Sequence, residues 1–452
     1  MNVALDTASH DSRRQATRVN EITGRFDPWL LGSVVTLACL GLVMIGSAAI
    51  AGGGQGAGPW YFLSRHAVYL SGGLVMAALA MRLELKTVEK YGQWLLLACF
   101  VVLAMVWLPF VGKTVNGARR WINLGPASFQ AVEMVKVFYI VWLASYLKRY
   151  NDDVAETWYA MLKPAGVAVL LVGMLLVQPD FGSSVLLLGI TAGMLLLGGA
   201  PIKRLILPVL VLIPGLVALV VLEPYRMRRV TSFMDPWQDQ LGAGYQLSNA
   251  LMAIGRGEWF GVGLGASVQK LSYLPEAHTD FIFSVMAEEL GLVGVCVVIG
   301  LYLLLAGRAF WLGMKCVEMK RHFSGYLAFG ISLWVTLQSF ISMGVNLGML
   351  PTKGLTLPLV SYGGSSVLMT CAAVGLLLRV SWEYERATRQ VALRRSVGNA
   401  AAQGTPPATA QPPSPATDAN PRGSQRGRGR IEPVLGRPAN EPAPIAALGR
   451  TR

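Results

Sequence analysis

The feature that most constrains this fold is a series of ten apolar runs, most of them about long enough to cross a lipid bilayer. A helix needs about 20 apolar residues for this, and in lipid its backbone polar groups must bond within the segment. The runs therefore predict an all-α integral membrane protein with about ten transmembrane helices. They lie at residues 29–51, 63–81, 93–110, 131–147, 164–177, 183–198, 205–222, 281–306, 325–350 and 358–380.

Composition supports the same class and excludes others. The 452-residue chain is 53% hydrophobic and 14% charged, whereas a soluble protein carries about 25% charged residues. The net charge of +14 is spread over loop ends and a C-terminal tail, without the aromatic-interleaved basic patch that binds nucleic acid, so membrane lipid is the expected contact. The five cysteines show no spacing that would indicate a disulfide framework or a metal–thiolate site.

Lysine and arginine in short connections set the orientation, because they are retained on the cytoplasmic side. The connection at 178–182 has none, so it is predicted to be external, with both termini cytoplasmic and a large external loop at 224–279 between helices 7 and 8. The predicted domains are a cytoplasmic tail at 1–28, a membrane domain at 29–380 and a disordered basic Pro/Ala/Gly-rich cytoplasmic tail at 381–452. The basic residues assigned to the cytoplasmic connections are Arg82, Lys86, Lys90, Lys148, Arg149, Lys163, Lys203, Arg204, Arg308, Lys315, Lys320 and Arg321.

Carboxylates cluster where the external loop enters the eighth run. Glu276, His278 and Asp280 lie in a polar segment, which places Asp280 at the boundary between water and hydrocarbon. Glu288 and Glu289 follow, about 12–14 Å deeper, where an ionisable group is costly unless it faces the protein interior or water. Two alternatives stay open: Asp280 as a helix N-cap, and the two glutamates as neutral groups or partners of a buried base.

Positive charge on the predicted external side exceeds what topology requires. Arg119 and Arg120 follow the third run, and Lys353 lies in the last external loop. In short Gly-rich loops such residues favour contact with an anionic ligand. In the long loop, ordinary surface charge is an equal alternative, because long loops cross whatever their charge. The cations of that loop are Arg226, Arg228, Arg229, Arg256 and Lys270.

Three further polar patches lie at predicted external helix ends. Glu133 and Lys136 are three residues apart, so they are neighbours on one helix face and can neutralise each other. Asp180 lies in a tight turn between the fifth and sixth runs. Ser365 belongs to a Gly-Gly-Ser-Ser segment that opens the last helix, where close helix packing is the alternative explanation.

Four stretches together resemble the SEDS family (shape, elongation, division and sporulation). They are residues 117–122, 178–182, 278–291 and 357–366, in the family's order and within the membrane domain. Residues 348–358 resemble the cell-division branch more than the elongation branch.

The resemblance implies a peptidoglycan glycosyltransferase that polymerises lipid II, a disaccharide-peptide on undecaprenyl pyrophosphate, at the outer face of the inner (cytoplasmic) membrane. Asp280 would be the catalytic general base for the attacking sugar hydroxyl, and external cations would hold the pyrophosphate. The substrate-binding candidates are Arg119, Arg120, Glu133, Lys136, Asp180, Glu276, Lys353 and Ser365.

The same resemblance implies a class B penicillin-binding transpeptidase of the FtsI type as partner, other divisome proteins, and a location at the division septum. The cofactor stays unknown, and a divalent cation stays open. The alternatives are a lipid II flippase, an elongation-type polymerase of the RodA kind, and a divisome scaffold without chemistry of its own. Replacing Asp280 separates an enzyme from a scaffold.

Overall fold

The computed structural model describes residues 24–49, 60–115, 117–123, 125, 128–271, 273–352 and 354–402. Met1–Arg395 form one compact unit, and Ser396–Arg452 form a second, of which the structure describes only 396–402, the end of the last helix. Most of the two predicted tails therefore lies outside the described residues.

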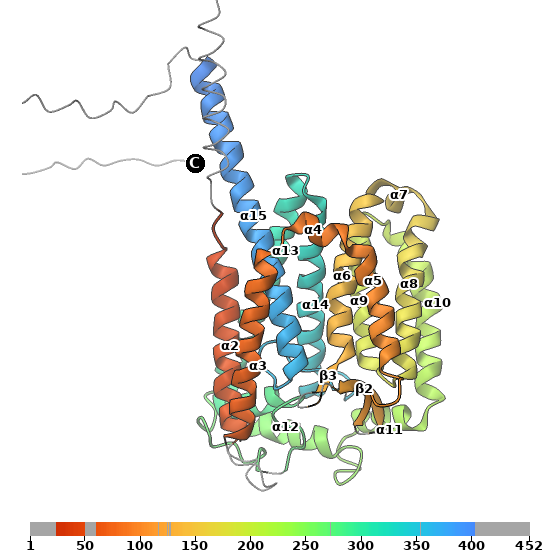
Figure 1. Cartoon of the computed structure of the whole chain (residues 1–452). Coiled ribbons are helices and arrows are strands. Elements are labelled where there is room, and N and C mark those ends of the chain that lie inside the picture. The colour runs from red at the N-terminus through yellow and green to blue at the C-terminus, as the bar shows by residue number, and fades with distance from the viewer. Residues whose placement is uncertain are drawn as a thin grey trace, which may run out of the picture. The chain divides into compact units, whose positions relative to one another are not determined.

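Helices run along the bundle at every predicted apolar run (Figure 1). Seven of them (α2, α3, α8, α10, α13, α14 and α15) are long and apolar enough to cross a membrane, and α5 and α9 are shorter apolar helices. The class of helical, multi-pass membrane protein is confirmed, and the number of crossings stays a prediction. The helices are α2 Pro28–Ala49, α3 Tyr61–Arg82, α5 Gly92–Met105, α6 Ala131–Arg149, α8 Trp158–Val177, α9 Phe181–Leu197, α10 Ile202–Val221, α13 Ile282–Glu318, α14 His322–Asn346 and α15 Gly364–Ala402.

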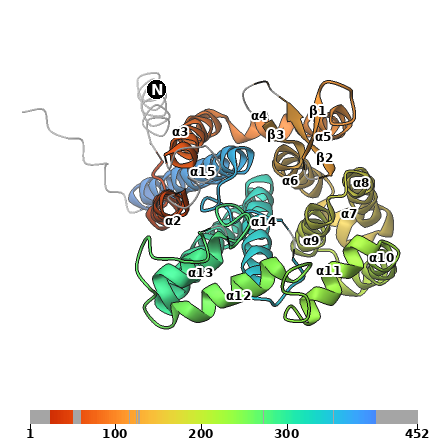
Figure 2. The ribbon, with the colours of Figure 1, turned by 90° about the horizontal axis from the view of Figure 1, so that it is seen from below.

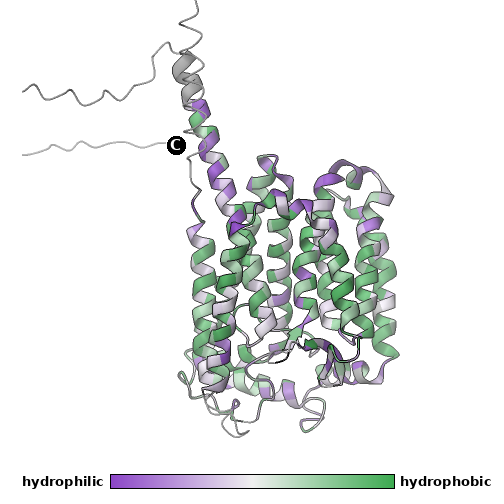
Figure 3. Ribbon diagram, viewed as in Figure 1, coloured by the Kyte–Doolittle hydropathy of each residue, from purple (hydrophilic) through white to green (hydrophobic). Residues whose placement is uncertain are grey.

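The helices divide into a buried centre and an apolar rim. Helix α14 packs against α6, α9 and α13, and 72% of its most apolar window is buried, against none for α10, which lies at the edge of the bundle (Figures 1 and 2). Apolar residues cover the sides of the bundle between two more polar ends (Figure 3). This is the surface that a bilayer requires, since lipid solvates apolar side chains and only the ends meet water.

Smaller elements close the two ends of the bundle. Strands β1 Gly112–Val115, β2 Ala118–Asn123 and β3 Ser128–Gln130 form an antiparallel sheet in the order β1-β2-β3, which the sequence did not predict. At the same end, α11 Pro224–Met234 and α12 Tyr245–Gly257 lie across the bundle (Figures 1 and 2). The short helices α4 Leu85–Lys90 and α7 Asn151–Glu156 lie at the other end.

The start of α2 meets α15 at the end of the bundle that holds α4 and α7. The backbone N–H of Asp27 donates to the Ser381 hydroxyl at 2.9 Å, and Arg308 pairs with the Asp27 carboxylate. Arg308 and Lys315 were expected in a connection, but α13 continues to Glu318 and carries both. Long basic side chains allow this, because their apolar stems pack on the helix while the charge reaches a partner or water.

The boundary predicted at residue 380 also falls within a helix, because α15 continues to Ala402. The remainder of the predicted disordered tail, 403–452, lies outside the described residues.

Helix α13 is kinked at Gly291, where the loop of residues 224–279 packs against it. Gly291 has φ 67°, and a Cβ there would lie 2.3 Å from the backbone nitrogen of Gly261, so glycine is needed for both conformation and space. Around this contact the Val262 N–H donates to the Glu288 carbonyl, and the Leu292 N–H donates to the Glu258 carbonyl, both at 2.9 Å. The loop therefore supplies backbone partners that the kinked helix lacks.

The two buried glutamates of α13 pair with cations from this loop. Lys270 Nζ lies 2.7 Å from Glu289 Oε1 and also donates to the Ser47 hydroxyl. Arg256 Nη1 lies 3.0 Å from Glu288 Oε1. Both glutamates are at most 1% exposed. Of the two alternatives from the sequence, the structure therefore agrees with the one in which they pair with basic groups. Lys270 is thus buried with its partner, whereas Arg256 reaches Glu288 from the surface with a side chain that is 47% exposed.

Candidate functional site

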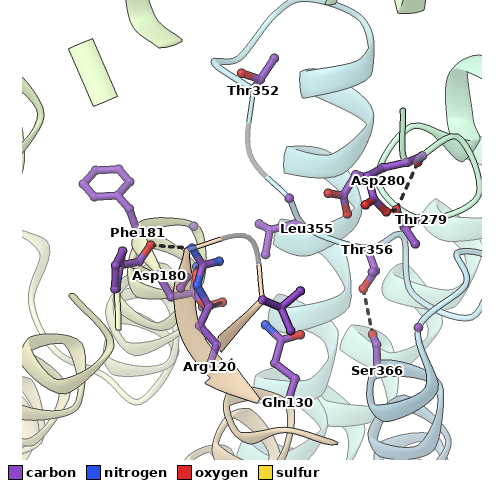
Figure 4. Close-up of a pocket in the computed structure, with 18 of the residues that line it drawn as sticks. Arg120, Gln130, Asp180, Phe181, Thr279, Asp280, Thr352, Leu355, Thr356 and Ser366 are labelled. Atoms are coloured by element: carbon purple, nitrogen blue, oxygen red, sulfur yellow. Dashed lines mark hydrogen bonds between the residues drawn. The ribbon is translucent and has the colours of Figure 1, made fainter. Parts of the chain in front are cut away.

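A cavity of about 920 Å³ opens at the end of the bundle that carries the sheet and α11 (Figure 4). Its walls come from β2, from the first turns of α6, α9 and α15, from α11, from the turn before α13 and from the α14–α15 connection. Segments up to about 250 residues apart thus meet around one polar space. Its charged and polar lining includes Arg120, Gln130, Glu133, Asp180, Arg226, Arg229, Glu276, Thr279, Asp280, Thr356, Tyr362, Ser365 and Ser366.

Asp280 presents its carboxyl group to this cavity from the turn before α13 (Figure 4). Among the described residues the N-cap position of α13 is Phe281, without a side-chain cap, so Asp280 does not serve as the cap. A Cβ added to Gly354 would lie 2.6 Å from Asp280 Oδ2. A side chain at position 354 would therefore displace the carboxylate from its present position.

Burial changes the acidity of this group. Removal from water raises the pKa of Asp280 to about 7, and the neighbouring Glu276 adds to the rise, while Arg229 and Arg120 oppose it. Burial also lowers the pKa of His278 in the same turn. A carboxyl with this pKa is partly ionised at neutral pH, where it can accept a proton from a substrate hydroxyl.

Three arginines approach the cavity from two elements. Arg120 on β2 donates from Nε to the Gln178 carbonyl at 3.1 Å and from Nη2 to the Pro179 carbonyl at 2.9 Å, which fixes the turn before α9. Arg229 on α11 donates to the Thr352 carbonyl at 2.9 Å. Arg226, one turn away on the same helix face, lies over the Phe181 ring with its guanidinium 5.7 Å from the centroid.

The predicted cations are distributed differently from expectation. Among the predicted substrate-binding cations that the structure describes (Arg119, Arg120 and Lys136), Arg120 alone lines the cavity. Arg119 donates from Nη2 to the Leu108 carbonyl at 2.8 Å, because adjacent residues on a strand point to opposite faces. Lys136 is 0% exposed, and its ammonium donates to Glu133 at 2.9 Å and to Gln338 at 2.8 Å. Lys353 lies outside the described residues.

The other predicted residues do line the cavity, with different local partners. Glu133 is paired with Lys136 at 2.9 Å, as the self-neutralising alternative describes. Asp180 caps α9, accepting from the Ser183 N–H at 3.2 Å and the Ser183 hydroxyl at 2.8 Å. Glu276 accepts from the Thr279 hydroxyl at 2.7 Å, and Ser365 lies at the start of α15.

For Arg226 and Arg229, the sequence left contact with an anionic ligand and ordinary surface charge as equal alternatives, and both line the cavity. Their spacing of three, just after a proline at the first helical position, is a usable signal, since it places both on one face of a short helix. Gln338 was missed altogether. It accepts from Lys136 and donates from Nε2 to the Thr356 carbonyl at 2.8 Å, which joins two walls of the cavity. A lone glutamine in an apolar run gave no signal of this role.

A bound metal ion would need several ligating side chains close together. Within the described part of the chain, no three His, Cys, Asp or Glu side chains come together as a metal site requires. Of the cavity's carboxylates, Glu133 is paired with Lys136, and Asp180 and Glu276 accept from hydroxyl groups.

Comparison with known proteins agrees with this architecture. The family model for FtsW, RodA and SpoVE, described as "Cell cycle protein", matches residues 28–386. A relative from Xanthomonas oryzae pv. oryzae, named "Probable peptidoglycan glycosyltransferase FtsW", is 69% identical over 397 residues, covering 88% of this chain and 81% of its own. One of the same name from Coxiella burnetii is 46% identical over 365 residues, covering 80% and 98%.

Solved structures give the same result. A chain from work described as "Structural coordination of polymerization and crosslinking by a peptidoglycan synthase complex" superposes with a TM-score of 0.66 at 33% identity, covering 79% of this chain and 98% of its own. Thermus thermophilus Rod shape determining protein RodA superposes with a TM-score of 0.58, also at 33% identity, covering 79% and 96%. The resemblance expected from the four sequence stretches is thus confirmed, and the chain belongs to the FtsW, RodA and SpoVE family of cell cycle proteins.

Proposed function

We propose that this protein is a peptidoglycan glycosyltransferase of the FtsW type that polymerises lipid II at the outer face of the inner membrane, during septal cell-wall synthesis. The names of the relatives give the activity. The chemistry is supported by one observation: the Asp280 carboxyl group faces a cavity that three arginines also line. The rest of the mechanism follows from these groups.

In the reaction, a sugar hydroxyl of the acceptor attacks the anomeric carbon of the lipid-linked donor. A new carbon–oxygen bond forms, and the bond between that carbon and the pyrophosphate oxygen breaks, with its electron pair leaving on the pyrophosphate. Asp280 accepts the hydroxyl proton as general base. The leaving group is a stable anion when it is paired with cations, so it requires no second carboxyl group as acid.

Arg120, Arg226 and Arg229 are the cations that hold the pyrophosphate, because the planar guanidinium group binds phosphate oxygens in pairs. Their charge stabilises the departing anion most when the bond is breaking, which lowers the barrier. Lys353, predicted from sequence, would add to this set.

Carboxylates and hydroxyls beside the arginines orient the sugars. Glu276 and Ser365 line the cavity and offer acceptors to substrate hydroxyls. Asp180 and Glu133 act indirectly. Asp180 holds the start of α9 in place, and Glu133 neutralises Lys136.

The proposed setting is the division septum, with a class B transpeptidase of the FtsI type and other divisome proteins as partners. One structural relative comes from a peptidoglycan synthase complex that couples polymerisation to crosslinking, which supports a partner of this kind. The cavity lies at one end of the bundle, so the lipid tail of the substrate can remain in the bilayer while its head reaches Asp280.

The test is lipid II polymerisation by purified protein in detergent, with and without the cognate transpeptidase, read as glycan strands on a gel. We expect Asp280→Asn to lower the rate by at least about 100-fold, while Asp152→Asn, an exposed carboxylate on α7, keeps it.

Two outcomes would contradict the proposal. Full polymerisation by Asp280→Asn would show that Asp280 is not the general base. A wild-type protein that makes no polymer even with its transpeptidase would favour a scaffold or a flippase, since polymer formation in detergent needs no second compartment.

A further inference from the structure

Asn346, the last residue of α14, makes an unusually complete set of hydrogen bonds. Its side chain is 0% exposed. Nδ2 donates to the Asp280 carbonyl at 2.9 Å and to the Ser342 carbonyl at 2.8 Å. Oδ1 accepts from the Ser284 N–H at 3.1 Å and the Ser284 hydroxyl at 2.8 Å. A carboxamide has two donors and two acceptor positions, and all four are engaged here.

These bonds hold the backbone on both sides of the Asp280 side chain. The carbonyl of Asp280 is fixed directly, and Ser284 lies in the first turn of α13, which begins at Ile282. The Ser284 N–H also donates to the Phe281 carbonyl at 3.1 Å, so Asn346 adds a second acceptor, from α14, at the start of the helix, where N–H groups lack the usual i−4 partner. Asn346 thus fastens the start of α13 and the turn before it to a neighbouring helix.

The surroundings leave the Asp280 carboxylate little freedom to compensate for a shift of its backbone. Gly354 approaches so closely that a Cβ there would lie 2.6 Å from Oδ2. On the other side of the turn, the Tyr362 N–H donates to the His278 carbonyl at 2.9 Å. A movement of the turn by an ångström would therefore change where the carboxylate points into the cavity.

We propose that Asn346 is a positioning residue for glycan polymerisation: it fastens the Asp280 turn to α14 and so keeps the carboxylate aimed at the acceptor hydroxyl. The inference rests on the proposed role of Asp280 as general base. Asn346 is not among the described residues that line the cavity, so it acts through Asp280 without touching substrate.

The decisive variant is Asn346→Asp, which keeps the shape and the acceptor for Ser284 but replaces the donor that faces the Asp280 carbonyl. The charged groups that face Asp280 are Glu276 of its own turn, Arg120 of β2 and Arg229 of α11, and the variant adds one negative charge beside them. We expect kcat to fall about 10- to 100-fold, since misplacement by about 1 Å has that effect, with KM changed less than about 3-fold.

The pH profile distinguishes a positioning role from a merely structural one, because a loss of structure alone would not shift the profile. A new negative charge disfavours ionisation of Asp280, so the rising limb of kcat/KM should move to higher pH by about one unit. The matched control is Asn249→Asp on α12. Asn249 is 6% exposed and donates to the carbonyl four residues before it at 2.8 Å, as Asn346 does to Ser342. We expect this control to keep the wild-type kcat and pH profile.

Ser284→Ala removes one of the four bonds without adding charge. We expect a fall in kcat of about 3-fold with the pH profile unchanged, in line with about 0.5–1.5 kcal/mol for one hydrogen bond. If Asn346→Asp does not fold, as judged by gel filtration and thermal unfolding, this variant decides.

A folded Asn346→Asp with wild-type kcat and pH profile would overturn the inference, as would wild-type kcat in Ser284→Ala if the first variant is unfolded. Either result, in a preparation whose wild type polymerises lipid II, leaves the proposed function intact. Loss of polymerisation in the wild type itself would count against the proposed function instead.

Discussion

At the scale of single residues, the environment of Asp280 decides whether it can act as a base. Asp in water has a pKa of about 3.9, and burial raises the pKa of Asp280 to about 7. The native state therefore binds more protons than the unfolded chain between these values, and the fold loses stability as pH rises through them. The protein keeps a partly buried carboxylate that opposes folding, as expected of a group kept for chemistry.

This pKa predicts the pH dependence of the reaction. Asp280 accepts a proton only when it is ionised, so kcat/KM should rise with pH through about 7 and level off above it. The measurement is the initial rate of lipid II polymerisation at low substrate concentration between pH 5 and 9 (about one point per half unit). A profile that is flat from pH 5 to 9 would contradict a base with this pKa.

The sequence predicted which residues belong to the site better than it predicted which way their side chains point. Asp280, Glu133, Asp180, Glu276 and Ser365 were predicted for the site and line the cavity. The orientation of the arginine pair could not be derived, because the strand that turns Arg119 and Arg120 to opposite faces was not predicted. Their neighbours in the strand are too few to show an alternating pattern.

At the scale of elements, apolar length was the reliable signal. Each long run became a helix because lipid leaves the backbone no other partner than itself. The sheet was missed because its strands have 3 to 6 residues and lie among glycines that predict turns. The end of α15 was missed because its second half is mostly polar and buries few apolar side chains, such as Ala387, which is too few for a sequence pattern.

The contact between the loop of residues 224–279 and α13 includes the buried pair of Lys270 and Glu289. We expect Glu289→Gln to lower the free energy of unfolding by about 3–5 kcal/mol, since it leaves the ammonium buried without an opposite charge. The double variant Lys270→Met/Glu289→Gln should recover much of that loss. Thermal unfolding in detergent at pH 7 measures both.

A matched control is the pair of Lys315 and Glu318, whose side chains are 36% and 60% exposed. Removing the charge with Glu318→Gln should change stability by no more than about 1 kcal/mol. Equal losses for the two glutamine variants would show that burial does not set the strength of the pair at Glu289.

At the scale of the whole molecule, orientation in the membrane is the expectation on which the proposed function depends. The start of α2 and helix α15 meet at one end of the bundle, and the cavity opens at the other. Positive charge in short connections assigns the first end to the cytoplasm. That assignment needed only the sequence, whereas the cavity needed the spatial contact of distant segments.

Thiol labelling of intact cells tests the orientation. In a variant without the five native cysteines, Thr114→Cys in the exposed part of β1 should react with a membrane-impermeant maleimide added outside. Lys90→Cys at the end of α4 should react only after the membrane is permeabilised. The reverse pattern would place Asp280 on the cytoplasmic side and exclude the proposed substrate face.

The contact of Ser47, Lys270 and Glu289 also has a consequence for biogenesis. Lys270 precedes Glu289 by 19 positions along the chain, so while the ribosome is still making the chain, Lys270 leaves the ribosome before its acidic partner does. A lone ammonium is poorly tolerated at that depth, so the segment around Lys270 stays hydrated until the eighth apolar run is inserted. Nascent chains that end before Glu289 should therefore be more susceptible to proteases in this segment than chains that extend past it.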